Sequence, residues 1–358
     1  MKFLWIAALL VGLNSHAVTP EEIVDHIARK VIVQDYVDLA SRAADLHASI
    51  LTLKSSPTQE NMLKAQQAWR DCRQPWETSE AFLYGPVSSL GLDPSIDTWP
   101  LNKIDLQAVL ASNRTLDLDF VRNLGANLQG FHTVEYLLFG EGTSAQKKVA
   151  SELTSKELEY LDSTSALLVE KTGQLAHAWT TNADPDNPSL PGFVEIISRP
   201  GPNNPFYPTT QAVLSEYVKG IIGILDEVAN GKIAGPMGST IGSADPSLVE
   251  SPFSWNSVAD FSNNVRSALY VYSGDYRATP GPGIIDVVRD TDPELAKNTE
   301  RALRRIIFEM SRIGGDVEIP FREAIVQPEP RKKIEHIIQL LNELSATFTN
   351  KILPIVEG

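Results

Sequence analysis

The sequence contains one cysteine, Cys72, and its 31 Lys and Arg residues are outnumbered by 45 Asp and Glu residues. A lone cysteine cannot form a disulfide within the chain, and it excludes zinc and iron–sulfur sites that need several thiolates. The formal net charge of −14 argues against nucleic acid as a partner, because phosphate binding requires a basic surface. Any bound metal ion would therefore be held by oxygen atoms and imidazole nitrogen.

Several catalytic motifs and membrane-spanning segments are also missing. The chain has no H-E-x-x-H, no P-loop, no G-x-S-x-G and no dinucleotide-binding glycine pattern, which excludes the enzyme classes that depend on them. Beyond residue 17, no run of about 18 apolar residues indicates a transmembrane helix. The hydrophobic content of 42% and the charged content of 21% are typical of a soluble folded protein.

The first 17 residues have the composition of a secretory signal peptide. Lys2 is followed by an apolar run over residues 3–13 and by a small-residue end at 15–17. This apolar run is too short to anchor the chain in a bilayer. We therefore predict cleavage after Ala17 and a periplasmic or secreted mature protein.

Helical signals dominate the remaining sequence. Apolar residues recur every three or four positions from 23 to 50, which is the period of one helix face. Capping patterns predict that helices begin at Thr154, Ser257 and Asp292. The helix that begins at Ser257 is predicted to end at Gly274. No alternation of apolar and polar residues is long enough to build a sheet. The sequence therefore predicts an all-α fold.

The segment 183–204 is crowded with proline, asparagine and glycine, and it separates two helical halves of similar size. We expect residues 18–182 and 205–358 to form two helical-bundle-like domains packed against each other, with 183–204 as the linker. Aromatic stretches that end at glycine, at 135–142 and 269–276, are a faint sign of duplication. Glycine is common at helix ends, so this similarity leaves the question open.

The stretch from Gly130 to Glu135 places two ionisable side chains in an apolar setting. His132 and Glu135 are three positions apart and project from one helix face. A buried carboxylate must find a cation, a hydrogen-bond donor or a proton. The pair could therefore form half of a metal site, or a buried hydrogen bond that joins two helices. Gly130 costs a helix interior about 1 kcal/mol relative to alanine, which indicates that another segment packs closely there.

Residues 69–86 contain candidate partners for this pair. If the segment is helical, Arg73, Trp76 and Glu80 share one face, and Glu77 lies beside them. The two glutamates could complete a metal site. Arg73 complicates this, because a guanidinium would occupy the carboxylates and repel a cation, although it could bind an anionic ligand instead. A buried Arg–Glu pair between tryptophans is the structural alternative.

Weaker candidates lie elsewhere in the chain. Asp97 lies in a loop in front of a Thr-Trp-Pro sequence. Asn256, Ser257, Asp260 and Asn264 lie around the start of a predicted helix in the second half. A helix cap would explain Ser257 and Asp260, whereas Asn264 has a poor helix propensity and no such explanation. These residues are candidates for lining a pocket.

The chain resembles the imelysin-like family of exported bacterial proteins. The resemblance spans nearly the whole mature chain and is carried by the segments 69–102, 130–140, 216–233 and 250–267. The G-x-H-x-x-E signature of the family is matched by Gly130, His132 and Glu135. The resemblance implies an all-α fold of two bundle-like domains with the signature near their interface. The family is classed with metallopeptidases, other members are iron-regulated, and related domains occur in iron-uptake components.

The residues and the resemblance together lead to a first hypothesis, an exported metal-binding protein connected to iron acquisition. Its ligands would be His132 and Glu135, completed by Glu80 or Glu77, with Asp97 nearby. Oxygen donors with one imidazole suit Fe, Zn or Mn. The partners would be the metal ion and other iron-uptake components.

Two other functions stay open. A metallopeptidase would use the same site, with Glu135, Glu77 or Glu80 as the base beside a metal-bound water. A non-catalytic binding or adaptor module would instead use Arg73 and the tryptophans to hold a small anionic or peptide ligand.

Overall fold

The computed structural model describes residues 18–143, 148–313 and 319–358. Within these ranges the chain forms helices, turns and loops, and the only β-type pairing is a single bridge between Tyr276 and Thr279. The all-α prediction is therefore confirmed. None of the helices in these ranges is long and apolar enough to cross a membrane. The predicted signal peptide, residues 1–17, lies outside the described residues.

The helices are connected by turns and loops, and one of the longer loops lies between α12 and α13. The first half contains α1 (Pro20–His26), α2 (Val33–Ser55), α3 (Gln59–Glu77), α4 (Pro86–Ser89), α5 (Asp93–Asp97), α6 (Lys103–Leu110), α7 (Leu118–Arg122), α8 (Gly130–Phe139) and α9 (Ser155–Thr180). The rest of the chain contains α10 (Phe193–Ile197), α11 (Thr210–Asp226), α12 (Ala234–Met237), α13 (Ser257–Ser273), α14 (Ile284–Thr291), α15 (Pro293–Met310), α16 (Phe321–Ala324), α17 (Pro328–Thr347) and α18 (Leu353–Glu357). Short π-helical segments join α1 to α2, α11 to α12, and α17 to α18.

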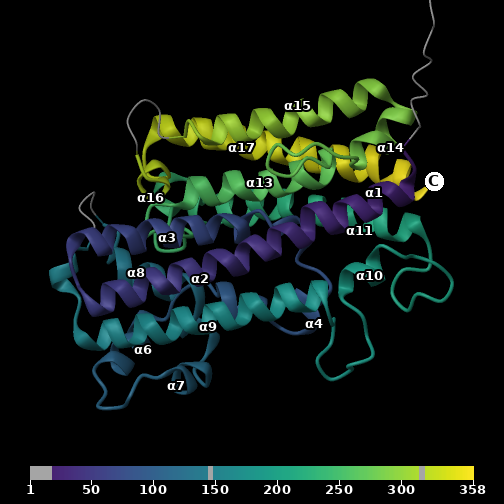
Figure 1. Ribbon diagram of the computed structural model, residues 1–358. Helices are drawn as coiled ribbons and strands as arrows, with labels where there is room; N and C mark the ends of the chain where they lie inside the picture. Colours follow the sequence, from purple (N-terminus) through teal and green to yellow (C-terminus); the bar gives the residue numbers. More distant parts are fainter. Residues whose placement is uncertain (1–17, 144–147, 314–318) are drawn as a thin grey trace, which may run out of the picture.

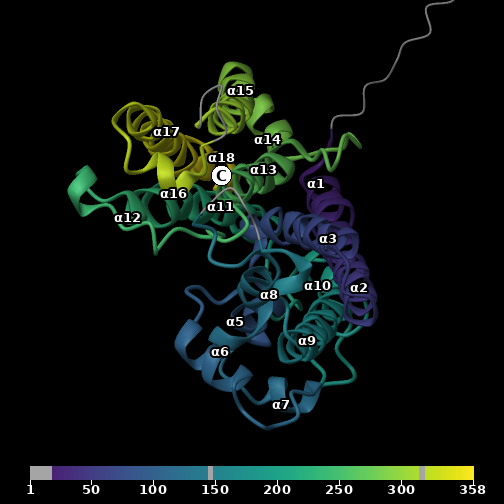
Figure 2. The ribbon, with the colours of Figure 1, turned by 90° about the vertical axis from the view of Figure 1, so that its left-hand side faces the viewer.

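The helices form two groups, one above the other in Figures 1 and 2. In the lower group, α2 packs along α3 and α9, and α8 packs against α3 and α9. In the upper group, α13 packs against α11 and α15, and α15 against α17. The groups meet where α3 contacts α13, and α1 extends from the lower group onto α11. The candidate residues of both halves converge at the contact between α3 and α13.

Several helix boundaries follow the capping chemistry expected from the sequence. Thr154 and Asp292 accept hydrogen bonds from backbone N–H groups of the first turn, and they precede α9 and α15 as predicted. Gly274 ends α13 in the left-handed conformation, with φ of 77°. The cap predicted at Ser257 is wrong: Ser257 is already the first residue of the helix, and its hydroxyl donates to the carbonyl oxygen of Glu250, 2.6 Å away.

The segment predicted as a linker folds back onto the first half. It contains α10, in which the ring of Phe193 meets that of Trp179 edge to face, with the centroids 5.0 Å apart. The buried apolar residues of both halves belong to one connected cluster. The division into two domains at this segment stays a prediction. One helix of the first half, α1, packs on α11 of the second half.

One buried carboxylate lies away from the candidate site, between α2 and the end of α3. Asp35 is fully buried, and its Oδ1 accepts hydrogen bonds from Thr78 Oγ1 at 2.7 Å and from the Tyr276 hydroxyl at 3.0 Å. Burial raises the pKa of Asp35 to about 7, although both hydrogen bonds oppose the rise. The folded chain therefore keeps a proton on Asp35 over a pH range in which the unfolded chain has lost it.

We predict that Asp35 makes the protein less stable as the pH rises. Below pH 3.8, the ordinary pKa, both the folded and the unfolded chain carry the proton, and above about pH 7 neither does. Stability is therefore lost between these two pH values. The loss is on the order of 3–4 kcal/mol, and Asp35→Asn should remove it. Urea unfolding of both proteins near pH 4 and pH 8 measures this, with the exposed Asp45→Asn on the same helix as control. A difference between Asp35→Asn and wild type that stays constant with pH would contradict the prediction.

Candidate functional site

The side chain of Arg73 lies at the centre of the candidate site. It is fully buried near the end of α3, a helix that includes Pro75 and ends at Glu77. Its Nη2 lies 2.6 Å from Glu77 Oε1 and 2.9 Å from Glu250 Oε1. Its Nη1 donates to Asp97. Arg73 therefore gathers carboxylates from three segments that are far apart in the sequence.

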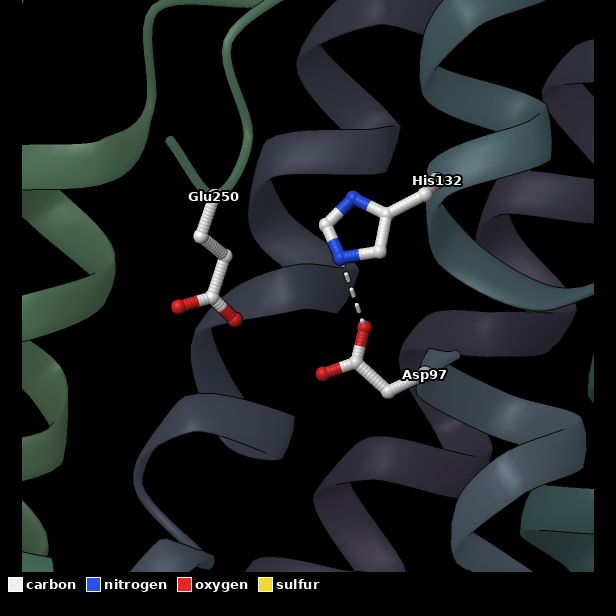
Figure 3. A group of neighbouring side chains, drawn as sticks. All are labelled: Asp97, His132 and Glu250. Atoms are coloured by element: carbon white, nitrogen blue, oxygen red, sulfur yellow. Dashed lines mark ion pairs between the residues drawn. The ribbon is translucent and has the colours of Figure 1, made fainter. Parts of the chain in front are cut away.

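The imidazole of His132, on α8, lies between two carboxylates. Nε2 is 3.2 Å from Asp97 Oδ1, and Nδ1 is 3.1 Å from Glu135 Oε2. Figure 3 shows the imidazole facing Asp97, with the carboxylate of Glu250 directed toward the same space. Burial alone would lower the pKa of His132, but the charge of Asp97 close to Nε2 and the hydrogen bond to Glu135 raise it to about 9. Without a metal ion this favours the protonated imidazole at neutral pH, so a metal ion that binds Nε2 has to displace a proton.

Glu135 connects this motif to the second half of the chain. Its Oε1 accepts hydrogen bonds from the backbone N–H of Phe253 at 3.1 Å and from the backbone N–H and hydroxyl of Ser254 at 2.8 and 2.7 Å. Its other oxygen faces His132. The carboxylate of Glu135 thereby holds the loop before α13 against α8.

Gly130 is the first residue of α8, so its predicted position inside the helix is wrong. Its backbone has φ of +70°, and a Cβ atom there would lie 2.2 Å from the carbonyl oxygen of Ile96. The close packing that the sequence indicated is confirmed. Because only glycine allows the end of α5 to approach α8 so closely, Gly130 brings Asp97 next to His132.

A second group of charges lies on the other side of the guanidinium. The ammonium of Lys232, in the π-helical segment after α11, is 3.4 Å from Glu80 Oε1 and 3.3 Å from Glu250 Oε2. Asn264 Nδ2 donates to Glu77 Oε2 at 2.5 Å. Burial raises the pKa of Glu80 to about 8, although the charge of Lys232 opposes the rise.

The remaining predicted residues also contact this cluster. Asp260 Oδ2 is 3.7 Å from Arg73 Nε, and Asn256 Nδ2 donates to Asp260 Oδ1 at 2.7 Å. Trp76 Nε1 donates to Asp97 Oδ2 at 2.6 Å. The structure therefore brings together candidate residues that the sequence placed in separate segments.

Among the residues that the structure describes, two sets of side chains have their metal-ligating atoms within 4.8 Å of one another. They are Asp97, His132 and Glu250 in one set, and Glu77, Glu80 and Asp97 in the other. The ligand set predicted from the sequence was His132 and Glu135 with Glu80 or Glu77, and Asp97 nearby. In the structure, His132 is grouped with Asp97 and Glu250. The first set is drawn in Figure 3.

Sequence reasoning missed Glu250 and Lys232. Glu250 lies in a loop, and Lys232 lies in a π-helical segment, so neither belongs to a regular helical pattern. Both residues lie inside segments that carry the family resemblance: Glu250 in 250–267 and Lys232 in 216–233. The resemblance could therefore have pointed to them.

A pocket of about 380 Å³ adjoins the site, and five of its ten lining residues are acidic. It is lined by Glu80, Leu83, Asp93, Asp97, Trp99, Glu227, Gly231, Lys232, Leu248 and Glu250. Trp99 also packs on His132, with ring centroids 4.7 Å apart. Negative charge therefore dominates the approach to the imidazole, which favours a cation over an anion as the bound species.

Comparison with known proteins decides the family. A sequence profile of the imelysin family matches residues 32–348. The chain belongs to the imelysin family. Iron-regulated protein A of Synechococcus elongatus is 26% identical over 346 residues, which make up 96% of this chain and 89% of the relative. The predicted resemblance is confirmed.

Two solved structures are similar to this member of the imelysin family in fold. One, assigned as an iron-regulated protein A precursor from Parabacteroides distasonis, has a TM-score of 0.81 and 24% identity, with 96% of each chain covered. The other, an imelysin-like protein from Psychrobacter arcticum, has a TM-score of 0.72 and 13% identity, with 96% of this chain and 98% of the other covered. These likenesses show that the helical fold is that of imelysin-like proteins.

We predict that Gly130→Ala destabilises this imelysin-family protein by about 2 kcal/mol or more, because a left-handed backbone alone costs alanine about 1–2 kcal/mol. The added methyl group must also push Ile96 away and so separate Asp97 from His132. Urea unfolding measures the first effect. NMR titration measures the second, since the pKa of His132 should fall from about 9 when Asp97 moves away.

Gly173→Ala provides the matched control, because Gly173 lies within α9 and a Cβ atom there meets open space. This variant should be neutral or more stable by up to about 1 kcal/mol. Wild-type stability and an unchanged His132 titration in Gly130→Ala would refute the proposed spacing role of Gly130.

Proposed function

We propose that this protein is an exported metal-binding protein with a role in iron acquisition, and that Asp97, His132 and Glu250 hold the ion. The observation that carries the proposal is the placement of their ligand atoms, which come from three segments and lie within 4.8 Å of one another. One imidazole and two carboxylates suit Fe²⁺, Zn²⁺ or Mn²⁺. The adjoining pocket gives the ion a way in.

Two buried atoms support this fit. His132 Nε2 and Glu250 Oε2 make no hydrogen bond within the described part of the chain, although one faces Asp97 and the other faces the ammonium of Lys232. Buried polar atoms in proteins are nearly always hydrogen-bonded. Two such atoms at one place therefore favour a further group, such as a metal ion, that binds both.

The contacts of Glu135 favour a supporting role in place of the ligand role first predicted for it. Three hydrogen bonds from Phe253 and Ser254 occupy one oxygen, and His132 Nδ1 occupies the other. Histidines that bind metals usually donate their second ring N–H to a carboxylate, which fixes the orientation of the ring. In this proposal Glu135 directs His132 Nε2 toward the ion.

The names of related proteins support the connection to iron and to export. The Synechococcus relative is named for iron regulation, and the Parabacteroides protein is described as a precursor. The signal-like composition of residues 1–17 agrees with export. The partners would then be a metal ion outside the cytoplasm and other components of iron uptake.

The metal content of the purified protein tests the proposal. Wild-type protein isolated from the periplasm without chelator should contain stoichiometric Fe, Zn or Mn by elemental analysis. His132→Ala should lose it, and Glu135→Gln should bind about 10- to 100-fold more weakly. His336→Ala, which changes an exposed histidine, should behave as wild type.

The same measurements separate this function from a non-catalytic adaptor. Metal at about 100 times its dissociation constant should add about 2.7 kcal/mol to the free energy of unfolding. An adaptor that binds a small or peptide ligand through Arg73 would contain no stoichiometric metal, and its stability would not respond to added divalent ions. That pair of results would reject the metal-binding proposal.

A metallopeptidase is the second candidate, and the position of Glu80 favours it. Glu80 lines the pocket, and burial raises its pKa to about 8, which suits a group that exchanges protons near neutral pH. Glu135 and Glu77 are less suited as bases, because Glu135 is fully hydrogen-bonded and Glu77 is paired with Arg73. This function requires hydrolysis of a denatured protein substrate that is abolished by a chelator and by Glu80→Gln. An absence of turnover in the metal-loaded protein would reject it.

A further inference from the structure

Lys232 places a positive charge among the proposed ligands. Its ammonium lies 3.3 Å from Glu250 Oε2, 3.4 Å from Glu80 Oε1 and 3.8 Å from Glu77 Oε2. Glu250 belongs to the set that contains His132, and the other two belong to the second set of grouped carboxylates. One ammonium therefore neutralises carboxylates of both sets.

The neighbouring cation, Arg73, is held much more firmly. Its side chain is 0% exposed and contacts Glu77, Asp97 and Glu250 together. The planar guanidinium makes these contacts in one fixed arrangement. The Lys232 side chain is 11% exposed and lines the pocket, and its flexible four-carbon stem allows the ammonium to move. Of the two cations, Lys232 is the one that can leave.

The local backbone gives the ammonium other partners. Lys232 lies in a π-helical segment, Glu227–Ile233, and such interruptions of a helix are frequent at functional sites. The segment also carries Glu227, which lines the same pocket as Asp93 and Lys232. An ammonium that moves away from Glu250 can therefore stay paired with a carboxylate in the pocket.

We propose that Lys232 is a tethered counter-ion that competes with the metal ion for Glu250, and so sets the affinity and the charge selectivity of the site. This inference rests on the proposed metal-binding function. When a metal ion binds Glu250, the ammonium moves into the pocket toward Glu227 and Asp93. A monovalent ion carries the same charge as the ammonium that it would displace, whereas a divalent or trivalent ion carries more. The site therefore selects multivalent cations.

Calorimetric titration of chelator-treated protein with Zn²⁺ tests this role. Lys232→Gln should bind Zn²⁺ about tenfold or more tightly than wild type, because no internal cation has to be displaced. In chelator the same variant should melt at a lower temperature than wild type, since the carboxylates have lost their counter-ion, and Zn²⁺ should restore the difference. Lys219→Gln is the control, because that side chain is 60% exposed and pairs with Glu357 at the surface.

A charge-conserving variant gives an independent measurement if Lys232→Gln does not fold. Lys232→Arg keeps the positive charge and adds a guanidinium that is harder to displace from carboxylates. It should bind Zn²⁺ more weakly than wild type. Binding as tight as in wild type would count against the competition.

The outcomes separate the two proposals. Unchanged or weaker Zn²⁺ binding by Lys232→Gln, with wild-type binding intact, overturns the role of Lys232 and leaves the metal site standing. An absence of Zn²⁺ binding by both proteins overturns both proposals. Binding by Lys232→Gln but not by wild type supports the competition by Lys232 and counts against metal binding as the function of the wild-type protein.

Discussion

One buried guanidinium, that of Arg73, connects the charged segments on which the site depends. It is enclosed on all sides and pairs with Glu77 from its own helix, Asp97 from α5 and Glu250 from the loop before α13. Removing one partner from such a group leaves an uncompensated buried charge, which costs several kcal/mol. The three segments are therefore fixed around Arg73, and the positions of the other polar side chains follow from this arrangement.

Three residues of α8 have different physical roles in this arrangement. Gly130 allows α5 to touch α8, because any side chain there would collide with the Ile96 carbonyl group. His132 presents one nitrogen to Asp97 and the other to Glu135. Glu135 joins α8 to the backbone of the second half. One residue thus controls spacing, one contacts two carboxylates and one joins the two halves of the chain.

The candidate site could be predicted from the sequence only where local patterns carried the information. The helical period and the apolar neighbours of His132 identified the motif, and the density of aromatic and charged residues identified Arg73 and its surroundings. The two errors in this region have the same origin: Gly130 and Ser257 occupy the ends of helices in which their roles are set by contacts with distant segments. Helix patterns do not encode such contacts.

Local sequence patterns were sufficient to predict a helical protein, because helix period and caps depend on neighbours within a few residues. The low cysteine content also implies that any metal ion would be bound by oxygen atoms and imidazole nitrogen. The proximity of His132 to Asp97 and Glu250, with Lys232 beside Glu250, became evident from the folded structure alone. These residues are far apart along the chain, and the packing of α3 against α8 and α13 brings them together. Long-range packing depends on the whole set of helices, so no single segment specifies it.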